Sequence, residues 1–328
     1  MKNSRKILAL IMAALMAMTA MVSCTVPAAD TEDDGVYNIG ICQLVEHVAL
    51  DAATKGFKDA LIEELGAENV KFDEQNAQND APTCATICNQ FVSDGVDLIM
   101  ANATPALIAA ASATNEIPIL GTSITEYGVA LELDDFDGTV GGNISGTSDL
   151  APLEEQAKMI KEWFPEAGNV ALLYCSGEAN SQYQVDEVKK YLEGMDITAT
   201  LYPFADSNDL SAICTTAATD NDVIYVPTDN TVASNTGIID NICRPMNKPV
   251  IAGEEGICGG CGVATLSISY YDLGVTTGKM AAKILRGEAK IEEMPIEYTT
   301  VTKKYNADIC TALGLEALEG YVAIETEE

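Results

Sequence analysis

Basic residues are scarce in this chain of 328 residues, and their scarcity excludes a class of partner. Only 18 lysines and arginines stand against 50 aspartates and glutamates, so the formal net charge is −32. Nucleic acids need a basic protein surface that neutralises their phosphates, and we therefore expect no nucleic-acid partner. The acidic balance instead favours a well-solvated exterior.

Histidine is almost absent as well, because His47 is the only one. Nucleophilic catalysis of the Ser-His-Asp or Cys-His kind would have to use this residue, and no paired carboxylate motif indicates acid–base chemistry. The CxxC motif at Cys258–Cys261 has no second CxxC that could complete a zinc site. We therefore expect a protein that is not an enzyme and that carries no metal and no cofactor.

Long apolar runs are confined to the N-terminus. A positively charged start precedes the apolar run Ile7–Val22, which ends just before Cys24. This order is typical of a secretory signal, and the cysteine resembles the lipobox of bacterial lipoproteins. The alternative is an uncleaved membrane anchor, but the run is shorter than the roughly 20 residues of a spanning helix. The pattern predicts a signal peptide over 1–23, a lipid on Cys24, a tether over 24–35, and a location on the extracytoplasmic face of the cell membrane.

Cysteine is frequent, with 10 residues in the chain. If Cys24 carries a lipid, an odd number remains, so at least one thiol stays unpaired. Cys42 and Cys175 lie in apolar stretches and are expected to be buried. Cys258 and Cys261 flank two glycines in a predicted loop, where we expect a local disulfide or two free thiols rather than a redox site.

Short apolar runs alternate with amphipathic ones along the rest of the chain. The expected strands are Tyr37–Cys42, Val70–Asp73, Val96–Ala101, Pro118–Gly121, Val170–Cys175, Ile197–Phe204, Val223–Val226, Val250–Ala252 and Ile296–Val301. The expected helices are Ala49–Leu65, Asp80–Ser93, Pro105–Thr114, Leu150–Trp163, Ala179–Leu192, Asp209–Ala218, Thr231–Met246 and Tyr271–Arg286. Nearly continuous apolar strands that alternate with helices predict parallel sheets covered on both faces. The predicted fold class is therefore α/β, with two doubly wound parallel-sheet lobes and a glycine-rich break near Gly141–Gly146.

Ligands of open parallel sheets bind beyond the carboxyl ends of the strands. Here those ends and the lobe junctions carry the segments Gln43–His47, Asn102–Pro105, Gly121–Thr125, Gly146–Asp149, Ser176–Ser181, Pro227–Asn230, Gly253–Glu255 and Ser269–Asp272. None of them contains a lysine or arginine, so a multiply anionic ligand is not expected. Helix N-termini can hold one carboxylate, and acidic side chains can hold an ammonium group. The predicted ligand is a zwitterion, that is, an α-amino acid.

Twelve polar residues of these segments are candidate ligand contacts. They are Gln43, Glu46, Thr104, Thr122, Ser123, Ser148, Asn180, Ser181, Asp229, Asn230, Glu254 and Asp272. Asp229 is the predicted partner of the ammonium group, with Glu46 as a second candidate, and Thr122 and Ser123 are expected to bind the carboxylate. Taken singly, each residue of this kind is also an ordinary helix cap. Only their convergence at strand ends in both lobes points to a binding site.

Several long motifs resemble one family. They are Ile39–His47, Asn76–Gln78, Gly142–Asp149, Tyr174–Ser181, Ile224–Val232 and Tyr270–Gly274. Together they resemble the tryptophan/tyrosine-type substrate-binding proteins of ABC transporters over nearly the whole mature chain. The resemblance implies a type I periplasmic-binding-protein fold, whose two lobes are joined by three crossovers and close on a ligand. The lobes would then comprise 36–145 with 267–294, and 146–266 with 295–328.

The same resemblance implies partners and a ligand class. A monomer would capture an aromatic amino acid (tryptophan, tyrosine or phenylalanine) and deliver it to a membrane permease driven by an ATPase. Two departures from the family concern the ligand: Val48 replaces the usual proline, and the stretch Glu254–Gly262 is unusual. The alternatives are another small solute, such as a sugar or nucleoside, or a ligand-binding component of a sensory system.

Overall fold

The computed structural model describes residues 35–324. The predicted signal peptide, Cys24 and nearly all of the predicted tether lie outside these residues, so the structure does not bear on them. Residues 36–328 form one compact unit. Within the described range, no helix combines the length and the apolar character that crossing a membrane requires.

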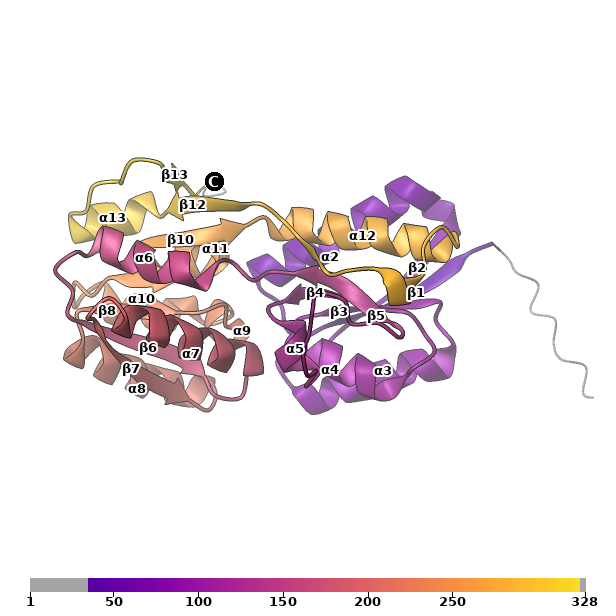
Figure 1. Ribbon diagram of the computed structural model, residues 1–328, viewed down its shortest axis with the longest axis horizontal. Coiled ribbons are helices and arrows are strands. Elements are labelled where there is room, and N and C mark those ends of the chain that lie inside the picture. The colour runs from indigo at the N-terminus through magenta and orange to yellow at the C-terminus, as the bar shows by residue number, and fades with distance from the viewer. Residues whose placement is uncertain (1–34, 325–328) are drawn as a thin grey trace, which may run out of the picture. The chain divides into compact units, whose positions relative to one another are not determined.

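The first lobe is built on a six-stranded sheet in which every neighbouring pair is parallel. Its strands, in spatial order, are β11 (Glu297–Tyr298), β5 (Ile144–Ser148), β4 (Ile119–Ile124), β3 (Leu98–Asn102), β1 (Tyr37–Gln43) and β2 (Val70–Asn76). Its helices are α2 (Val48–Leu65), α3 (Ala81–Asp94), α4 (Thr104–Ala113), α5 (Tyr127–Ala130) and α12 (Tyr270–Leu285), with 3-10 turns η1 (Ala67–Asn69) and η2 (Ile291–Glu293). α2 and α12 cover one face, and α3 and α4 cover the other (Figure 1).

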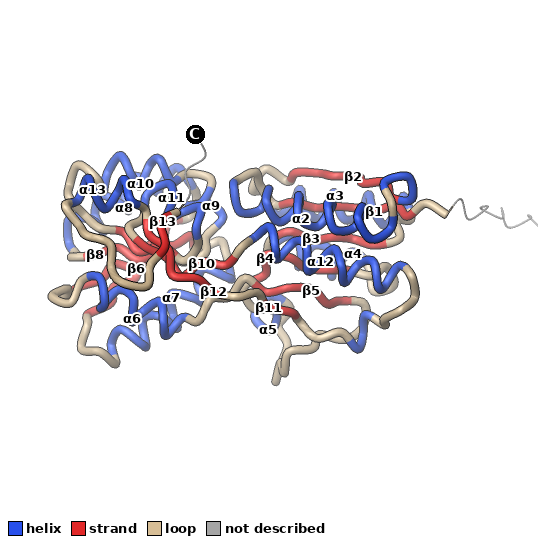
Figure 2. Tube along the Cα trace, turned by 90° about the horizontal axis from the view of Figure 1, so that it is seen from above, coloured by secondary structure: helices blue, strands red, loops and turns tan. Residues whose placement is uncertain are grey.

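The second lobe is built on a seven-stranded sheet. Its strands, in spatial order, are β13 (Val322–Ala323), β12 (Val301–Tyr305), β10 (Ala264–Ile268), β9 (Val250–Ala252), β8 (Val223–Val226), β6 (Asn169–Cys175) and β7 (Thr198–Phe204). Its helices are α6 (Leu153–Trp163), α7 (Ala179–Glu193), α8 (Ser207–Asp220), α9 (Asn230–Ala233), α10 (Thr236–Cys243), α11 (Glu255–Cys261) and α13 (Ala307–Leu313). β12 runs antiparallel to β10, and the other pairs are parallel. α6 and α7 cover one face, and α8, α10 and α11 cover the other (Figure 2).

Strand alternation explains why both faces of each sheet are apolar. In β1, Ile39 and Ile41 pack against Phe57 and Met280 of α2 and α12, whereas Cys42 packs on the other side against α3. Side chains of neighbouring residues in a strand point to opposite faces, so a strand buried on both sides is a continuous apolar run. The predicted α/β fold with two doubly wound lobes is therefore confirmed.

The chain passes between the two sheets three times, at residues 149–152, at residue 269 and at residues 299–300 (Figure 1). The predicted lobe boundaries differ from these positions, because the break expected at residues 145/146 falls inside β5. Gly146 belongs to the glycine-rich break that the sequence predicts between the lobes. It instead lies in the strand with φ of +145°, where a Cβ atom would be 2.1 Å from the carbonyl oxygen of Gly121. Glycine is needed there because two backbones approach closely.

The two other boundaries also shift by a few residues. The boundary expected at residues 266/267 falls inside β10, which belongs wholly to the second sheet. The boundary expected at residues 294/295 assigns β11 to the second lobe, but β11 pairs with β5 of the first. The single strand expected over Ile296–Val301 is in fact divided between the two sheets.

Two further local predictions are corrected. The helix expected over Thr231–Met246 is divided into α9 and α10. At the break, the side chains of Ser234 and Asn235 donate to the carbonyl groups of Asn230 and Thr231 in α9, and such local side-chain bonds compete with a continuous helix. The CxxC motif lies in helix α11 rather than in a loop, and the nine cysteines of the described residues are all free.

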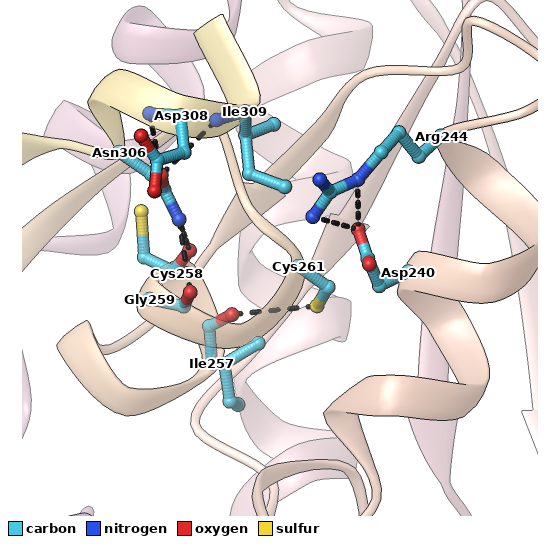
Figure 3. A network of polar contacts seen from close by, with 9 residues as sticks. All are labelled: Asp240, Arg244, Ile257, Cys258, Gly259, Cys261, Asn306, Asp308 and Ile309. Atoms are coloured by element: carbon cyan, nitrogen blue, oxygen red, sulfur yellow. Dashed lines mark hydrogen bonds and ion pairs between the residues drawn. The ribbon is translucent and has the colours of Figure 1, made fainter. Parts of the chain in front are cut away.

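Side chains at both ends of α11 compensate for its glycines, which are poor helix formers. Glu254 caps the N-terminus by accepting from the backbone N–H of Gly256 at 2.6 Å and of Ile257. Near the other end, Asn306 Nδ2 donates to the carbonyl oxygens of Cys258 and Gly259, at 3.1 and 2.9 Å (Figure 3).

Candidate functional site

The loops at the carboxyl ends of the two sheets meet between the lobes. They enclose a cavity of about 150 Å³ that residues of both lobes line. From the first lobe come Leu44, Asn79, Ala81 and Pro105; from the second come Cys175, Gly177, Glu178, Ala205, Asp206 and Thr231. The predicted position of the binding site, at strand ends of both lobes, therefore coincides with an interlobe cavity that has apolar walls and polar groups.

Backbone strain marks the first-lobe side of this site. Ala103 directly follows β3, and Ser123 is the last residue but one of β4; their φ angles are positive, at 88° and 55°. Such conformations cost free energy in residues other than glycine and tend to cluster at binding and catalytic sites. Ala103 provides no side-chain cap for α4, and the Oγ atom of Ser123 is buried without a hydrogen-bond partner. Ser123 thus offers a hydroxyl group without a partner, next to the N-terminus of α4 at Thr104, which no side chain caps.

Two other predicted residues of this lobe use their hydroxyl groups within the protein. Thr122 Oγ1 lies 3.2 Å from Thr147 Oγ1 in a buried contact. Ser148 Oγ donates to the carbonyl oxygen of Thr125 at 2.9 Å and accepts from the backbone N–H of Leu150. Ser148 therefore shapes the first crossover.

The remaining first-lobe candidates lie near the start of α2 or α12. Gln43 is held inside the lobe, because its amide donates to Asp51 and accepts from Thr54, both at 2.6 Å. Glu46 is exposed and lines a separate cavity of about 500 Å³ beside α2. Asp272 is also exposed, in the first turn of α12. The structure does not gather these three side chains into one buried cluster.

Asp229 is the N-cap of α9, and both of its carboxylate oxygens are occupied. They accept from the backbone N–H groups of Cys175 at 2.7 Å and Val232 at 2.9 Å. Burial, and then the neighbouring charge of Glu178, raises the pKa of Asp229 to about 8. The carboxylate thus connects the ends of β6 and β8, which is the capping role that a sequence also allows for such a residue.

Glu178 has the most hydrogen bonds in this region, although it was not among the predicted contacts. Its carboxylate accepts from the backbone N–H and side chain of Asn230 at 3.0 and 2.7 Å, and from those of Thr231 at 2.8 Å each. Asn180 Nδ2 is a further donor at 3.3 Å. The only sequence signal for this role is the position of Glu178 directly before α7.

Asn180 and Ser181 begin α7 and face the loop after β8. Asn180 Nδ2 also donates to the carbonyl oxygen of Thr228 at 3.0 Å, and Ser181 Oγ donates to the same oxygen at 3.4 Å. The Oδ1 atom of Asn180 is buried without a partner. This oxygen is therefore an acceptor that an N–H or O–H group of a ligand can use.

In the part of the chain that the structure describes, two hydrogen-bonded side-chain pairs link the lobes, beside apolar packing of Ile268 with Ala49 and Ala53 of α2. His47 Nε2 lies 3.4 Å from Asn230 Oδ1, and Asn79 Nδ2 donates to Thr231 Oγ1 at 3.1 Å. Burial lowers the pKa of His47, whereas the contact with Asn230 and the charge of Glu178 act in the opposite direction.

A buried acidic group lies where two of the crossovers meet. Asp149 Oδ2 accepts from the hydroxyl group of Tyr270 at 2.8 Å, while its Oδ1 atom is buried without a partner. Burial raises the pKa of Asp149, and burial likewise raises that of nearby Glu254 to about 7. Sequence reasoning singled out the segment Gly146–Asp149 but selected Ser148 within it, although the acidic residue was the stronger signal.

Comparisons with known proteins agree with this architecture. Residues 38–318 match the family model described as ABC transporter substrate binding protein. The chain is 34% identical over 333 residues to a tyrosine-binding protein of Clostridioides difficile (strain R20291), covering 97% of this chain and 95% of the relative.

Two solved structures are informative about the lobe arrangement. A Streptococcus pneumonia ABC domain in complex with L-Trp is 33% identical, with a TM-score of 0.83 over 88% of this chain and 100% of that one. The ligand-free, open structure of a Clostridium difficile substrate-binding protein with adhesive properties is 38% identical but has a TM-score of 0.68, over 89% and 100%. The lobes of this chain are therefore arranged more as in the complex than as in the open structure, in agreement with its interlobe hydrogen bonds. From the family match and these relatives, the chain belongs to the substrate-binding proteins of ABC transporters.

Proposed function

We propose that this protein captures an aromatic α-amino acid, tyrosine or tryptophan, between its two lobes. A 34% identical relative is a tyrosine-binding protein, and a structural neighbour of similar identity is in complex with L-Trp. Among the cavity-lining residues, Leu44 and Pro105 of the first lobe and Cys175 and Ala205 of the second supply apolar walls for a ring.

The observation that carries this proposal is the unpartnered Oδ1 atom of the buried Asp149. A buried carboxylate oxygen without a donor is costly, and an ammonium group would provide a charged donor for it. We assign the ligand's ammonium group to Asp149 rather than to Asp229, because both oxygens of Asp229 already accept backbone N–H groups.

The ligand's carboxylate is assigned to Ser123 and the start of α4. The Oγ atom of Ser123 is an unpartnered donor, and α4 has ten residues and no side-chain cap. Uncapped backbone N–H groups at a helix N-terminus attract a carboxylate without a basic side chain. Asn180 Oδ1 would accept a further hydrogen bond from the second-lobe side.

We further propose that the mature protein is held by a lipid on Cys24 at the extracytoplasmic face of the membrane and delivers its ligand to a permease with an ATPase. The N-terminal pattern supports the anchor, and membership of the family supports the permease. The proposed role is capture and delivery without chemical change of the ligand.

Isothermal titration calorimetry on the protein from residue 25 onward tests the ligand class. We expect heat of binding with tyrosine or tryptophan and none with sugars or nucleosides. Asp149→Asn should weaken binding at least about 30-fold, because losing one partner of a buried charged pair costs roughly 2 kcal/mol or more.

Asp196→Asn is the matched control. It makes the same chemical change at an exposed turn with φ of +60°, an angle that asparagine tolerates. Asp196 lies just before β7 starts, so it is far from the carboxyl ends of the strands. Unchanged affinity in Asp149→Asn would remove Asp149 from the site. Absence of binding to any aromatic amino acid would refute the proposed ligand class.

A further inference from the structure

Both polar contacts between the lobes involve two adjacent residues of the second lobe, Asn230 and Thr231. These two residues are also the main donors to the carboxylate of Glu178. Glu178 is only 5% exposed, so its polar contacts are chiefly these hydrogen bonds rather than water. One buried carboxylate therefore holds both second-lobe residues of these two hydrogen bonds.

Glu178 also determines the direction of both interlobe hydrogen bonds. The Nδ2 atom of Asn230 lies 2.7 Å from a carboxylate oxygen, which can only accept, so the Oδ1 atom of Asn230 must face His47. His47 therefore carries a proton on Nε2. Likewise, the hydroxyl group of Thr231 donates to Glu178 at 2.8 Å, which leaves its oxygen as the acceptor for Asn79.

The first lobe thus supplies two donors, and the second lobe supplies two acceptors. We propose that Glu178 is a positioning residue for lobe closure, because it orients the Asn230 and Thr231 acceptors that His47 and Asn79 bind only when the lobes meet. These two hydrogen bonds then contribute to the free energy of lobe closure independently of the ligand. Such a contribution raises the closed fraction of the ligand-free protein and, by linkage, its affinity for a ligand that prefers the closed state.

A carboxylate is required at this position, and an amide cannot replace it. The donors around Glu178 are two backbone N–H groups, two side-chain amides and one hydroxyl group. In Glu178→Gln, one of the two acceptor oxygens becomes an NH₂ group that faces these donors. The Asn230 amide or the Thr231 hydroxyl group then turns, and the acceptors presented to the first lobe are lost.

The test measures closure without any ligand. Spin labels or fluorophores on the two lobes report the interlobe distance distribution of the ligand-free protein from residue 25 onward. We expect Glu178→Gln to shift this distribution toward open forms. Because the buried variant can fail to fold, two changes on the first-lobe side test the same contact independently: His47→Ala, and Asn79→Gly, which keeps the backbone at φ of +63°.

Gln78→Gly is the matched control, since Gln78 is the exposed neighbour with φ of +53°. Asn79→Gly should lower the closed fraction relative to Gln78→Gly, and its affinity for tyrosine or tryptophan should fall about 3- to 10-fold. Combined with Glu178→Gln, Asn79→Gly should add little, because both remove the same hydrogen bond.

Equal closed fractions in Asn79→Gly, His47→Ala and the control would overturn the inference. The measured affinity for tyrosine or tryptophan rests on the proposed function, but the closed fraction is measured without ligand. Failure to bind aromatic amino acids would therefore refute the ligand assignment and leave the closure measurement to decide on Glu178.

Discussion

Helix α12 packs against α2 through glycines, and this contact allows a stability prediction that does not depend on the ligand. A Cβ atom added at Gly274 would lie 1.9 Å from the carbonyl oxygen of Ala53 and 2.9 Å from the backbone nitrogen of Phe57. Gly56 and Gly278 make similarly close contacts with backbone of the facing helix. Gly274→Ala is thus expected to force the two helices apart.

The magnitude follows from the geometry. Ordinary van der Waals contact begins at 3.4 Å, so the added methyl group is about 1.5 Å too close to an atom that cannot rotate away. Overpacking of this kind typically costs 1–3 kcal/mol or more, and the better helix propensity of alanine returns up to about 1 kcal/mol. Because the overlap is with backbone that cannot rotate away, we place the cost at or above the upper end of this range. We expect Gly274→Ala to lower the free energy of unfolding by about 2–3 kcal/mol, which corresponds to a fall in Tm of several degrees.

Urea and thermal unfolding measure the change, with Gly237→Ala as control. Gly237 lies in α10, where an added Cβ atom meets nothing within 4 Å, so this variant should be more stable by about 0.5–1 kcal/mol. Gly274→Ala should also weaken ligand binding, because α12 begins at Tyr270, which hydrogen-bonds Asp149. A Gly274→Ala protein as stable as the wild type would refute the packing argument.

Three further predictions concern titration, thiols and fluorescence. Because the pKa of Glu254 is raised from 4.5 to about 7 in the folded protein, its contribution to stability falls as the pH rises from 4.5 through 7. The free energy of unfolding of Glu254→Gln, relative to that of the wild type, should therefore rise by up to about 3 kcal/mol between pH 5 and 8 in urea unfolding. Parallel pH profiles of the two proteins would contradict this. All nine described cysteines are buried and free, so a thiol reagent should react slowly with the native protein from residue 25 onward. After unfolding it should react with all nine thiols, and a smaller number of reactive thiols would indicate a disulfide. Trp163 is buried against Tyr305 and Tyr321 in the second lobe, so its fluorescence should report unfolding but change little when tyrosine is added.

The fold could be predicted from the sequence because its strands are buried on both faces. Runs such as Val170–Cys175 have no polar residue that could lie on a solvated face, and the helices between them begin and end at clear signals such as Asp80 and Gly95. β5 was missed because its one glycine, Gly146, is needed for close backbone contact with Gly121, and composition alone cannot distinguish that need from a break between lobes.

The sequence predicted a site at strand ends of both lobes, but it could not indicate which carboxylate has an oxygen without a hydrogen-bond donor. Whether a carboxylate oxygen is available to a ligand depends on contacts from other strands, such as the one between Asp229 and the backbone N–H of Cys175. The sequence around Asp229 shows only a capping residue followed by a helix. Asp149 differs because one of its oxygens has no donor, which only the assembled crossovers reveal.

The late position of α12 and β11 in the chain has a consequence for the order of folding during synthesis. The first sheet and helix α2 are synthesised early, but the helix that covers α2 and the strand that completes the sheet follow only after β10 of the second lobe. Until residues 270–298 are synthesised, the side of α2 that packs against α12 stays uncovered by that helix, so the first lobe is begun first but completed only after most of the second lobe has been made. A chain truncated before residue 270 should therefore be unable to finish either half of the molecule.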